Sequence, residues 1–265
     1  MSRIAQTFDQ LRRRRERALI TYITAGDPDI KTTHEILRCL IDSGADMIEL
    51  GIPFSDPMAD GPTIQAASQR ALRHPFSLRR IFDLVQQVRR HSEIPLILFG
   101  YYNPFYQYGL ERACREAQSV GVDGLLVVDL PPEEALPLHQ AARTHSLDTI
   151  FLLAPTSTAE RMKRVASMAS GFVYYVSVTG VTGARERLAE EMDTAVARIR
   201  KYTTLPVGIG FGISQPAHVR SLAPFADAVI VGSALIKIIE SRLGKPDMLK
   251  HLATFVRSLK KATTW

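Results

Sequence analysis

The stretch IELGIPFSDPMADGPTIQ, residues 48–65, contains the unit from which the fold of this chain is predicted. A short apolar run with Glu49 inside it leads into a loop rich in Pro, Asp and Gly, and a helical pattern begins at Pro62. This passage from strand through loop to helix is typical of α/β proteins. The loop contains two more acids, Asp56 and Asp60, so the same stretch raises the question of what chemistry these carboxylates serve.

Seven further apolar runs resemble this one, and helix-like segments separate them. Most of the runs are continuously apolar, which is typical of strands covered on both faces. Eight alternating units in about 250 residues predict a closed (β/α)8 barrel, with a doubly wound open sheet as the alternative. The strand-like runs span residues 18–23, 47–50, 95–100, 124–130, 148–154, 172–178, 206–211 and 228–233. Helix-like segments include residues 32–44, 78–91 and 159–170.

The barrel is expected to occupy the whole chain, residues 1–265, as a single domain. No low-complexity tract or interdomain linker interrupts the alternation of strand-like and helix-like segments. An additional helix is expected over about residues 2–16, before the first strand, and the final helix is expected to end near Lys260.

The formal net charge of +6 comes partly from local clusters such as Arg12–Arg15. Without a recognisable nucleic-acid-binding module, such clusters are typical of solvated helix faces and of mild attraction for anionic substrates. Cys39 and Cys114 have helix-like neighbours and are expected to be reduced packing residues. Neither a signal peptide nor an apolar stretch of membrane-spanning length stands out, so we expect a cytoplasmic protein.

Two carboxylates are the main candidates for catalysis. In (β/α)8 barrels the chemistry lies at the C-terminal ends of the strands and in the loops that follow them, where Glu49 and Asp60 are expected. Desolvation of Glu49 between Ile48 and Leu50 favours its protonated form, which suits a group that exchanges protons near neutral pH. Two acids in different surroundings can divide protonation and deprotonation between them.

Each acid also has a structural interpretation. Glu49 can be a buried acid bonded to the backbone or to a hydroxyl. Asp60, in MADGPT, can form a turn or a helix cap. Asp56, between a serine and a proline, is more typical of a residue that shapes a loop or makes a contact than of a catalyst.

Glycine-rich segments end strands six, seven and eight, at residues 178–185, 208–214 and 231–234. Glycine lets backbone N–H groups approach a ligand, helix N-termini attract anions, and these loops often hold a phosphate in barrels. Each glycine alone most often marks a turn. Together with the two acids, the segments predict an enzyme acting on a phosphorylated small molecule. The candidate phosphate cradle consists of Gly183, Gly212, Gly232 and Ser233.

Aromatic residues near the strand ends can pack in the core or line a pocket for a flat, apolar part of a ligand. They are Tyr22, Tyr101, Tyr102, Tyr174, Tyr175 and Phe211. Histidines do not cluster at metal-binding spacing, so no metal is inferred. The sequence lacks a GxSxG elbow and a lysine placed for a Schiff base, which argues against those two mechanisms.

Seven motifs resemble those of the tryptophan synthase alpha subunit family, nearly from end to end of the chain. The most specific is ELGIPFSDPMADGPTIQ (49–65). The others are YITAGDPD (22–29), YYNPFYQYG (101–109), DLPPEE (129–134), VTGVTGAR (178–185), GFGIS (210–214) and VGSALIK (231–237).

The resemblance implies a lyase that cleaves indole-3-glycerol phosphate to indole and glyceraldehyde 3-phosphate, without a cofactor in this chain. It implies that Glu49 is the main acid/base and that Asp60 accepts a hydrogen bond from the indole N–H. A sugar-phosphate isomerase barrel is the fallback if the resemblance misleads.

Substrate contacts follow from the same resemblance. It implies that phosphate lies on backbone groups around Gly183, Phe211, Gly212, Gly232 and Ser233. Tyr22 and Tyr101 are further candidate contacts, and Tyr174 matches the substrate-contacting tyrosine of strand six, with Tyr175 as a one-residue ambiguity. Residues 178–185 are expected to form a mobile lid, in which Thr182 orders Asp60 on closure.

The resemblance also implies a partner, the pyridoxal-phosphate-containing beta subunit, in an α2β2 heterotetramer. The residues expected to face it, in loops, are Pro53, Asp56, Pro57 and Asn103. A free-standing lyase without a beta partner is the alternative. A non-catalytic barrel that activates the beta subunit is a third possibility, against which the intact Glu49 and Asp60 argue.

Overall fold

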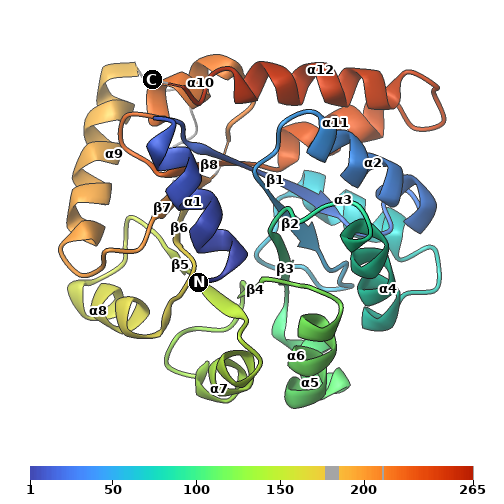
Figure 1. Ribbon diagram of the computed structural model, residues 1–265, viewed down its shortest axis with the longest axis horizontal. Helices are drawn as coiled ribbons and strands as arrows, with labels where there is room; N and C mark the ends of the chain where they lie inside the picture. The colour runs from blue at the N-terminus through green and yellow to red at the C-terminus, as the bar shows by residue number, and fades with distance from the viewer. Residues whose placement is uncertain (177–184, 211, 265) are drawn as a thin grey trace.

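The computed structural model describes residues 1–176, 185–210 and 212–264, and its eight strands close into a barrel (Figure 1). Neighbouring strands along the chain pair in parallel, and β8 pairs in parallel with β1. The predicted (β/α)8 barrel is therefore confirmed, and the open sheet is wrong. The strands are β1 (Ala18–Thr24), β2 (Met47–Gly51), β3 (Leu96–Gly100), β4 (Gly124–Val127), β5 (Asp148–Leu153), β6 (Val173–Val176), β7 (Val207–Gly210) and β8 (Ala228–Val231).

Helices surround this barrel (Figure 1). In the described ranges they are α1 (Arg3–Arg13), α2 (Ile30–Asp42), α3 (Pro62–Ala71), α4 (Leu78–Arg89), α5 (Tyr102–Tyr108), α6 (Leu110–Ser119), α7 (Leu136–Thr144), α8 (Ala159–Met168), α9 (Arg185–Arg200), α10 (Pro216–Leu222), α11 (Ser233–Ser241) and α12 (Met248–Lys260). The extra N-terminal helix and the end of the last helix at Lys260 are confirmed. Some connections contain two helices, such as α3 and α4 between β2 and β3.

An apolar cluster inside the barrel closes its N-terminal end. Alternate residues of a strand point to opposite faces, so Met47 of β2 faces the interior while Ile48 faces the helices. Ile4, Phe8 and Leu11 of α1 belong to the interior cluster. The amphipathic helix α1 therefore seals the end of the barrel at which the strands begin.

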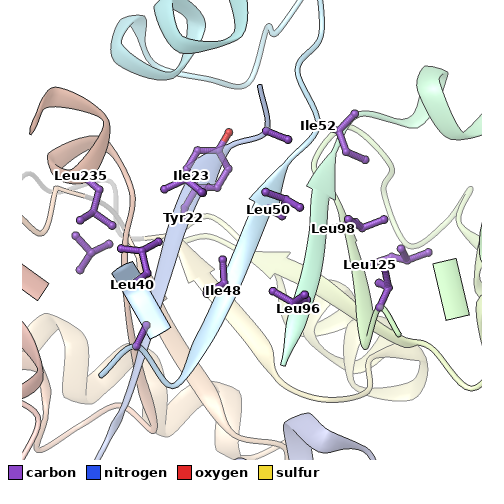
Figure 2. Packing of buried hydrophobic residues seen from close by; sticks show 14 of the residues in the cluster. Tyr22, Ile23, Leu40, Ile48, Leu50, Ile52, Leu96, Leu98, Leu125 and Leu235 are labelled. Atoms are coloured by element: carbon purple, nitrogen blue, oxygen red, sulfur yellow. The ribbon is translucent and has the colours of Figure 1, made fainter. Parts of the chain in front are cut away.

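A second apolar cluster fills the layer between the strands and the helices. Figure 2 shows Ile48 and Leu50 of β2 beside Leu96 and Leu98 of β3, with Leu40 of α2 in the same cluster. These side chains are completely buried. Burial of each leucine stabilises the fold by about 2 kcal/mol, so the two clusters hold the strand ends in fixed positions.

Aspartates placed just before three strands link neighbouring strands at the closed end. Each accepts the N–H of a residue at or beside the start of an adjacent strand and pairs with a cation. The bonds join Leu19 N to Asp46 at 2.7 Å, Leu96 N to Asp123 at 2.8 Å and Val207 N to Asp227 at 3.0 Å. The cations are Lys260, Arg89 and Arg200, respectively.

Strand ends differ from the prediction mainly at β4, which stops at Val127 instead of continuing to residue 130. The following DLPP segment contains two prolines, which cannot donate to a strand ladder. Asp129 there accepts the N–H of Tyr102 at 2.8 Å. Cys39 and Cys114 are free thiols on α2 and α6, as predicted. Within the described ranges, no helix is both long and apolar enough to cross a membrane.

Candidate active site

A cavity of about 610 Å³ opens at the C-terminal ends of the strands. Its size suits a small organic ligand. Seven of the predicted site residues line it together, from β1, β2, β6 and the loops after β2, β7 and β8. They are Tyr22, Glu49, Asp60, Tyr174, Gly212, Gly232 and Ser233. Thr182, Gly183 and Phe211 lie outside the described residues.

Glu49 points into the cavity, next to the apolar cluster that fills the interior of the barrel. The alternation that points Met47 inward on β2 also points Glu49 inward, two residues later. Only 1% of Glu49 is exposed, and burial raises the pKa of its carboxyl to about 8. Its Oε1 atom has no hydrogen-bond partner among the described residues. At neutral pH the group is therefore mostly protonated and able to donate to a ligand.

Asp60 lies in the loop between β2 and α3, on the rim of the same cavity. Partial burial raises the pKa of its carboxyl to about 6, and a hydrogen bond from the Tyr101 side chain opposes part of this rise. The interpretation of Asp60 as the cap of α3 is wrong. The N-cap residue is Gly61, and no side chain within the described ranges caps this helix. At neutral pH the Asp60 carboxyl is mostly ionised.

Tyr101 holds the loop that carries Asp60 and is not among the described residues that line the cavity. Its hydroxyl accepts the N–H of Ala59 at 2.9 Å, and its ring stacks on Phe54 with centroids 5.1 Å apart. Gln65 of α3 also donates to the Asp60 carbonyl at 2.8 Å. The sequence predicts a substrate contact at Tyr101, whereas the contacts found there are with the loop itself.

Tyr22 fills the space above Gly51. These residues lie on paired strands, β1 and β2, and Tyr22 is directly opposite Glu49 in the register. A Cβ atom at position 51 would lie 2.3 Å from the Tyr22 hydroxyl, which also lies 3.3 Å from Thr24 Oγ1. Only glycine at position 51 leaves room for this ring beside the acid.

Of the two adjacent tyrosines of β6, Tyr174 lines the cavity, which favours the alignment that gives it the substrate contact. Tyr175 is buried and does not line the cavity, as strand alternation requires. Burial raises the pKa of the Tyr174 hydroxyl well above its usual value, and the nearby Glu49 and Tyr22 add to the rise. The hydroxyl therefore remains protonated and can donate a hydrogen bond.

The opposite wall is formed by backbone at the ends of β7 and β8. Gly212 has a φ of 69°, in the left-handed region that favours glycine. Gly232 is the N-cap of α11 and has no side-chain capping bond, while its own carbonyl accepts the N–H groups of Leu235 and Ile236. The first N–H groups of α11, including that of Ser233, have no acceptor within their helix. This wall offers backbone donors to an anion.

Several cavity residues were not singled out from the sequence. Apolar walls come from Ile64, Phe99, Leu152, Ile213 and Phe255, which belong to five different segments. Lys237 of α11 adds a positive charge. Ile64, Ile213 and Lys237 stand inside the quoted motifs, but nothing in those motifs marks them as cavity residues. The proximity of all six depends on how strands and helices from different segments pack together.

The four residues expected to face a partner differ in exposure. Asp56 and Asn103 are exposed and Pro57 is partly exposed, whereas Pro53 is buried within this chain. Asn103 lies in the first turn of α5 and not in a loop, since Tyr101 is the N-cap of that helix. Pro53 therefore packs within this chain, in the loop between β2 and α3, instead of facing a partner.

The chain is similar to proteins of one family over nearly its whole length. A family model described as the tryptophan synthase alpha chain matches residues 8–264. The tryptophan synthase alpha chain of Geotalea uraniireducens is 55% identical over 260 residues, covering 98% of this chain and 97% of the relative. That of Geobacter sulfurreducens is 52% identical and covers 99% of each chain.

Solved structures give the same result. Tryptophan synthase subunit alpha from Legionella pneumophila superposes with a TM-score of 0.92 at 41% identity, covering 99% of this chain and 98% of that one. A chain from a study of mutual activation in the tryptophan synthase α2β2 complex of Pyrococcus furiosus has a TM-score of 0.85 and 44% identity. It covers 92% of this chain and 98% of its own.

Proposed function

Because this chain belongs to the tryptophan synthase alpha chain family, we propose that Glu49 and Asp60 are the residues with which it carries out the family's reaction. That reaction is the cleavage of indole-3-glycerol phosphate to indole and glyceraldehyde 3-phosphate, a carbon–carbon lyase step of tryptophan biosynthesis. The observation that carries the assignment is the buried, mostly protonated Glu49, whose Oε1 lacks a partner among the described residues in a cavity that it shares with Asp60.

The two acids have complementary roles in the proposed mechanism. An indole carbon is a poor leaving group as a carbanion. Glu49 therefore protonates the ring at the carbon that bears the glycerol chain, which makes the ring an electron sink. Asp60, as a carboxylate, accepts a hydrogen bond from the indole N–H and stabilises the positive charge that develops there.

Glu49 then acts as the base. Once it has given up its proton, the carboxylate removes the proton of the adjacent substrate hydroxyl as the carbon–carbon bond breaks. The electrons of that bond return to the indole ring, and the hydroxyl carbon becomes the aldehyde of glyceraldehyde 3-phosphate. One proton enters and one leaves, so Glu49 ends the step protonated again.

We place the substrate phosphate at the wall formed by Gly212, Gly232 and Ser233. The first N–H groups of α11, which have no acceptor within their helix, and the partial positive charge of that helix end support this placement. Thr182, Gly183 and Phe211 keep the roles that the family resemblance implies for them, the first with Asp60 and the other two at the phosphate.

We also propose that the face around the cavity binds a tryptophan synthase beta subunit, as part of an α2β2 assembly. Three large apolar side chains that are unusually exposed follow adjacent strands β2, β3 and β4 on this face. They are Met58, Tyr106 and Leu136, with exposures of 91%, 60% and 55%. Such apolar groups beside the exposed Asp56 and Asn103 are typical of a protein interface. The names of the relatives favour this subunit role over a free-standing lyase.

Indole release from indole-3-glycerol phosphate by the purified chain, alone and with a beta subunit, tests the proposal. We expect slow release alone and a marked increase when the beta subunit is added. High activity that the beta subunit leaves unchanged would favour the free-standing lyase. If no indole is released under either condition, the catalytic roles of both acids are refuted and their structural interpretations remain.

A further inference from the structure

The described walls of the cavity carry two acidic side chains but a single cationic one. Glu49 and Asp60 are the acids, and Lys237 is the only lysine or arginine among the described residues that line the cavity. No ion pair of Lys237 is found within the described part of the chain, whereas many of the arginines pair with acids. A phosphate monoester that enters this cavity meets one cationic side chain in its described wall.

The position of Lys237 on α11 directs this charge toward the phosphate wall. Ser233 is the first residue of α11, and Lys237 follows it by four residues on the same face. Side chains of a helix lean toward its N-terminus and cover the turn before their own Cα. A lysine at this position is therefore directed toward the first turn of α11, where the N–H group of Ser233 lies, and Ile238 and Phe255 line the same cavity.

We propose that Lys237 is a substrate-binding residue that attracts and holds the phosphate end of indole-3-glycerol phosphate by its charge. This inference rests on the phosphate placement proposed above and adds to it. The backbone donors fix the position of the phosphate, whereas Lys237 offsets the repulsion between a doubly charged phosphate and the ionised Asp60. Because Lys237 is exposed, its contribution is screened by salt and acts on binding, not on the bond-breaking step.

Calorimetric titration with glycerol 3-phosphate, which carries the phosphate without the indole ring, tests this role. At an ionic strength of about 0.01 M, where the Debye length is about 30 Å, Lys237→Gln is expected to raise the Kd about fivefold. At about 0.15 M, with a Debye length of about 8 Å, the increase is expected to shrink to about twofold. Lys237→Arg keeps the charge and should restore the Kd and its salt dependence.

Steady-state kinetics of the chain with its beta subunit separate binding from structure. Lys237→Gln should raise KM for indole-3-glycerol phosphate while kcat stays within about twofold. Lys245→Gln is the matched control, because Lys245 is an exposed lysine just beyond the same helix and outside the cavity wall. It should leave both Kd and KM unchanged.

A third variant distinguishes failure of this inference from failure of the proposed phosphate site. Ser233→Asp places a negative charge at the phosphate wall and should abolish binding of glycerol 3-phosphate. If Ser233→Asp does so while Lys237→Gln leaves the Kd unchanged at low salt, the role of Lys237 is refuted and the phosphate site stands. If Ser233→Asp also leaves the Kd unchanged, both are refuted.

Discussion

Glu49 and Asp60 show how different depths of burial, together with one hydrogen bond, give two carboxylates different protonation states. Glu49 is 1% exposed inside the barrel, and burial raises its pKa to about 8. Asp60 lies on the rim, where partial burial raises its pKa to about 6 and Tyr101 limits the rise. Near pH 7 the deeper acid is thus a proton donor, and the shallower one is a charged acceptor. The proposed mechanism requires this division.

A bell-shaped pH dependence follows from this pair. The value of kcat/KM for indole release should rise as Asp60 loses its proton near pH 6 and fall as Glu49 loses its proton near pH 8. Asp60→Asn should lower the maximum and remove the acidic flank while keeping the alkaline one. A profile without an alkaline flank would contradict the role of Glu49 as the initial proton donor.

Replacing Glu49 by glutamine separates catalysis from folding. Glutamine fills nearly the same volume but cannot exchange a proton, so kcat is expected to fall about 10³-fold. Binding of a non-cleavable indolyl-alkyl phosphate, measured by calorimetry, should remain within a few-fold of the wild-type value. Loss of folding in Glu49→Gln would support a structural acid instead.

The same variant has a characteristic effect on stability. The folded chain holds the Glu49 proton up to about pH 8, whereas the unfolded chain releases it near pH 4.5. Wild-type stability therefore contains a contribution that is lost as pH rises across this window. Glu49→Gln lacks this loss, so its Tm relative to wild type should increase between pH 5 and pH 8. A constant difference in Tm would contradict the raised pKa.

At the scale of elements, the loop between β2 and α3 is positioned by a helix that follows a different strand. Tyr101 precedes α5, after β3, and its hydroxyl accepts the N–H of Ala59 at 2.9 Å. Its ring stacks on Phe54 of the same loop. The position of Asp60 is therefore set by the packing of two consecutive strand–helix units.

Tyr101→Phe should disturb this loop without disturbing the barrel. The ring and its stacking remain, but the Ala59 N–H loses its acceptor and Asp60 loses a donor. We expect kcat/KM to fall about tenfold, which corresponds to about 1.4 kcal/mol and is within the net contribution of the two hydrogen bonds that are lost. The acidic flank of the pH profile should also move to higher pH, because the bond that lowers the Asp60 pKa is gone. Tyr202→Phe, at a half-buried tyrosine after α9 that lines neither the cavity nor the proposed interface, is the control and should change neither.

The strands could be predicted from the sequence, because buried parallel strands are continuously apolar and glycine or turn residues separate them. The motif residues Glu49 and Asp60 could also be assigned to one face. The direction in which each side chain points could not be predicted from the sequence. Tyr101 turns to the neighbouring loop that carries Asp60, and Pro53 is buried within the chain. Lys237 lies in the motif of residues 231–237, but its position in the cavity wall shows only once α11 is packed on the barrel. These outcomes depend on packing between segments, which no local pattern encodes.

At the scale of the whole molecule, the two ends of the barrel have different tasks. The C-terminal end carries the cavity. The N-terminal end is closed by α1 and by the aspartates that link neighbouring strands. Asp123 links three elements, since it accepts hydrogen bonds from Leu96 N at 2.8 Å, Arg89 at 2.7 Å and Arg3 of α1 at 3.0 Å.

Asp123→Asn should therefore lower stability and spare catalysis. The change leaves the mostly buried Arg89 without its counter-charge, at a cost of about 3 kcal/mol in the free energy of unfolding. Urea denaturation measures this loss, and kcat of the folded variant should stay within about twofold of wild type. Asp83→Asn, at an exposed pair with Arg79, should cost less than about 1 kcal/mol. Equal losses in the two variants would contradict the role of Asp123.

The fit of the Tyr22 ring above Gly51 restricts the order in which these two positions can be substituted during evolution. A methyl group at position 51 would meet the hydroxyl at 2.3 Å and ring carbons at 2.6 and 2.8 Å, so replacing the tyrosine by phenylalanine would not make room for it. Alanine fits at position 51 only after Tyr22 has been replaced by a residue without an aromatic ring. The order of the two substitutions is thus fixed by volume, and glycine at position 51 is inherited together with the ring.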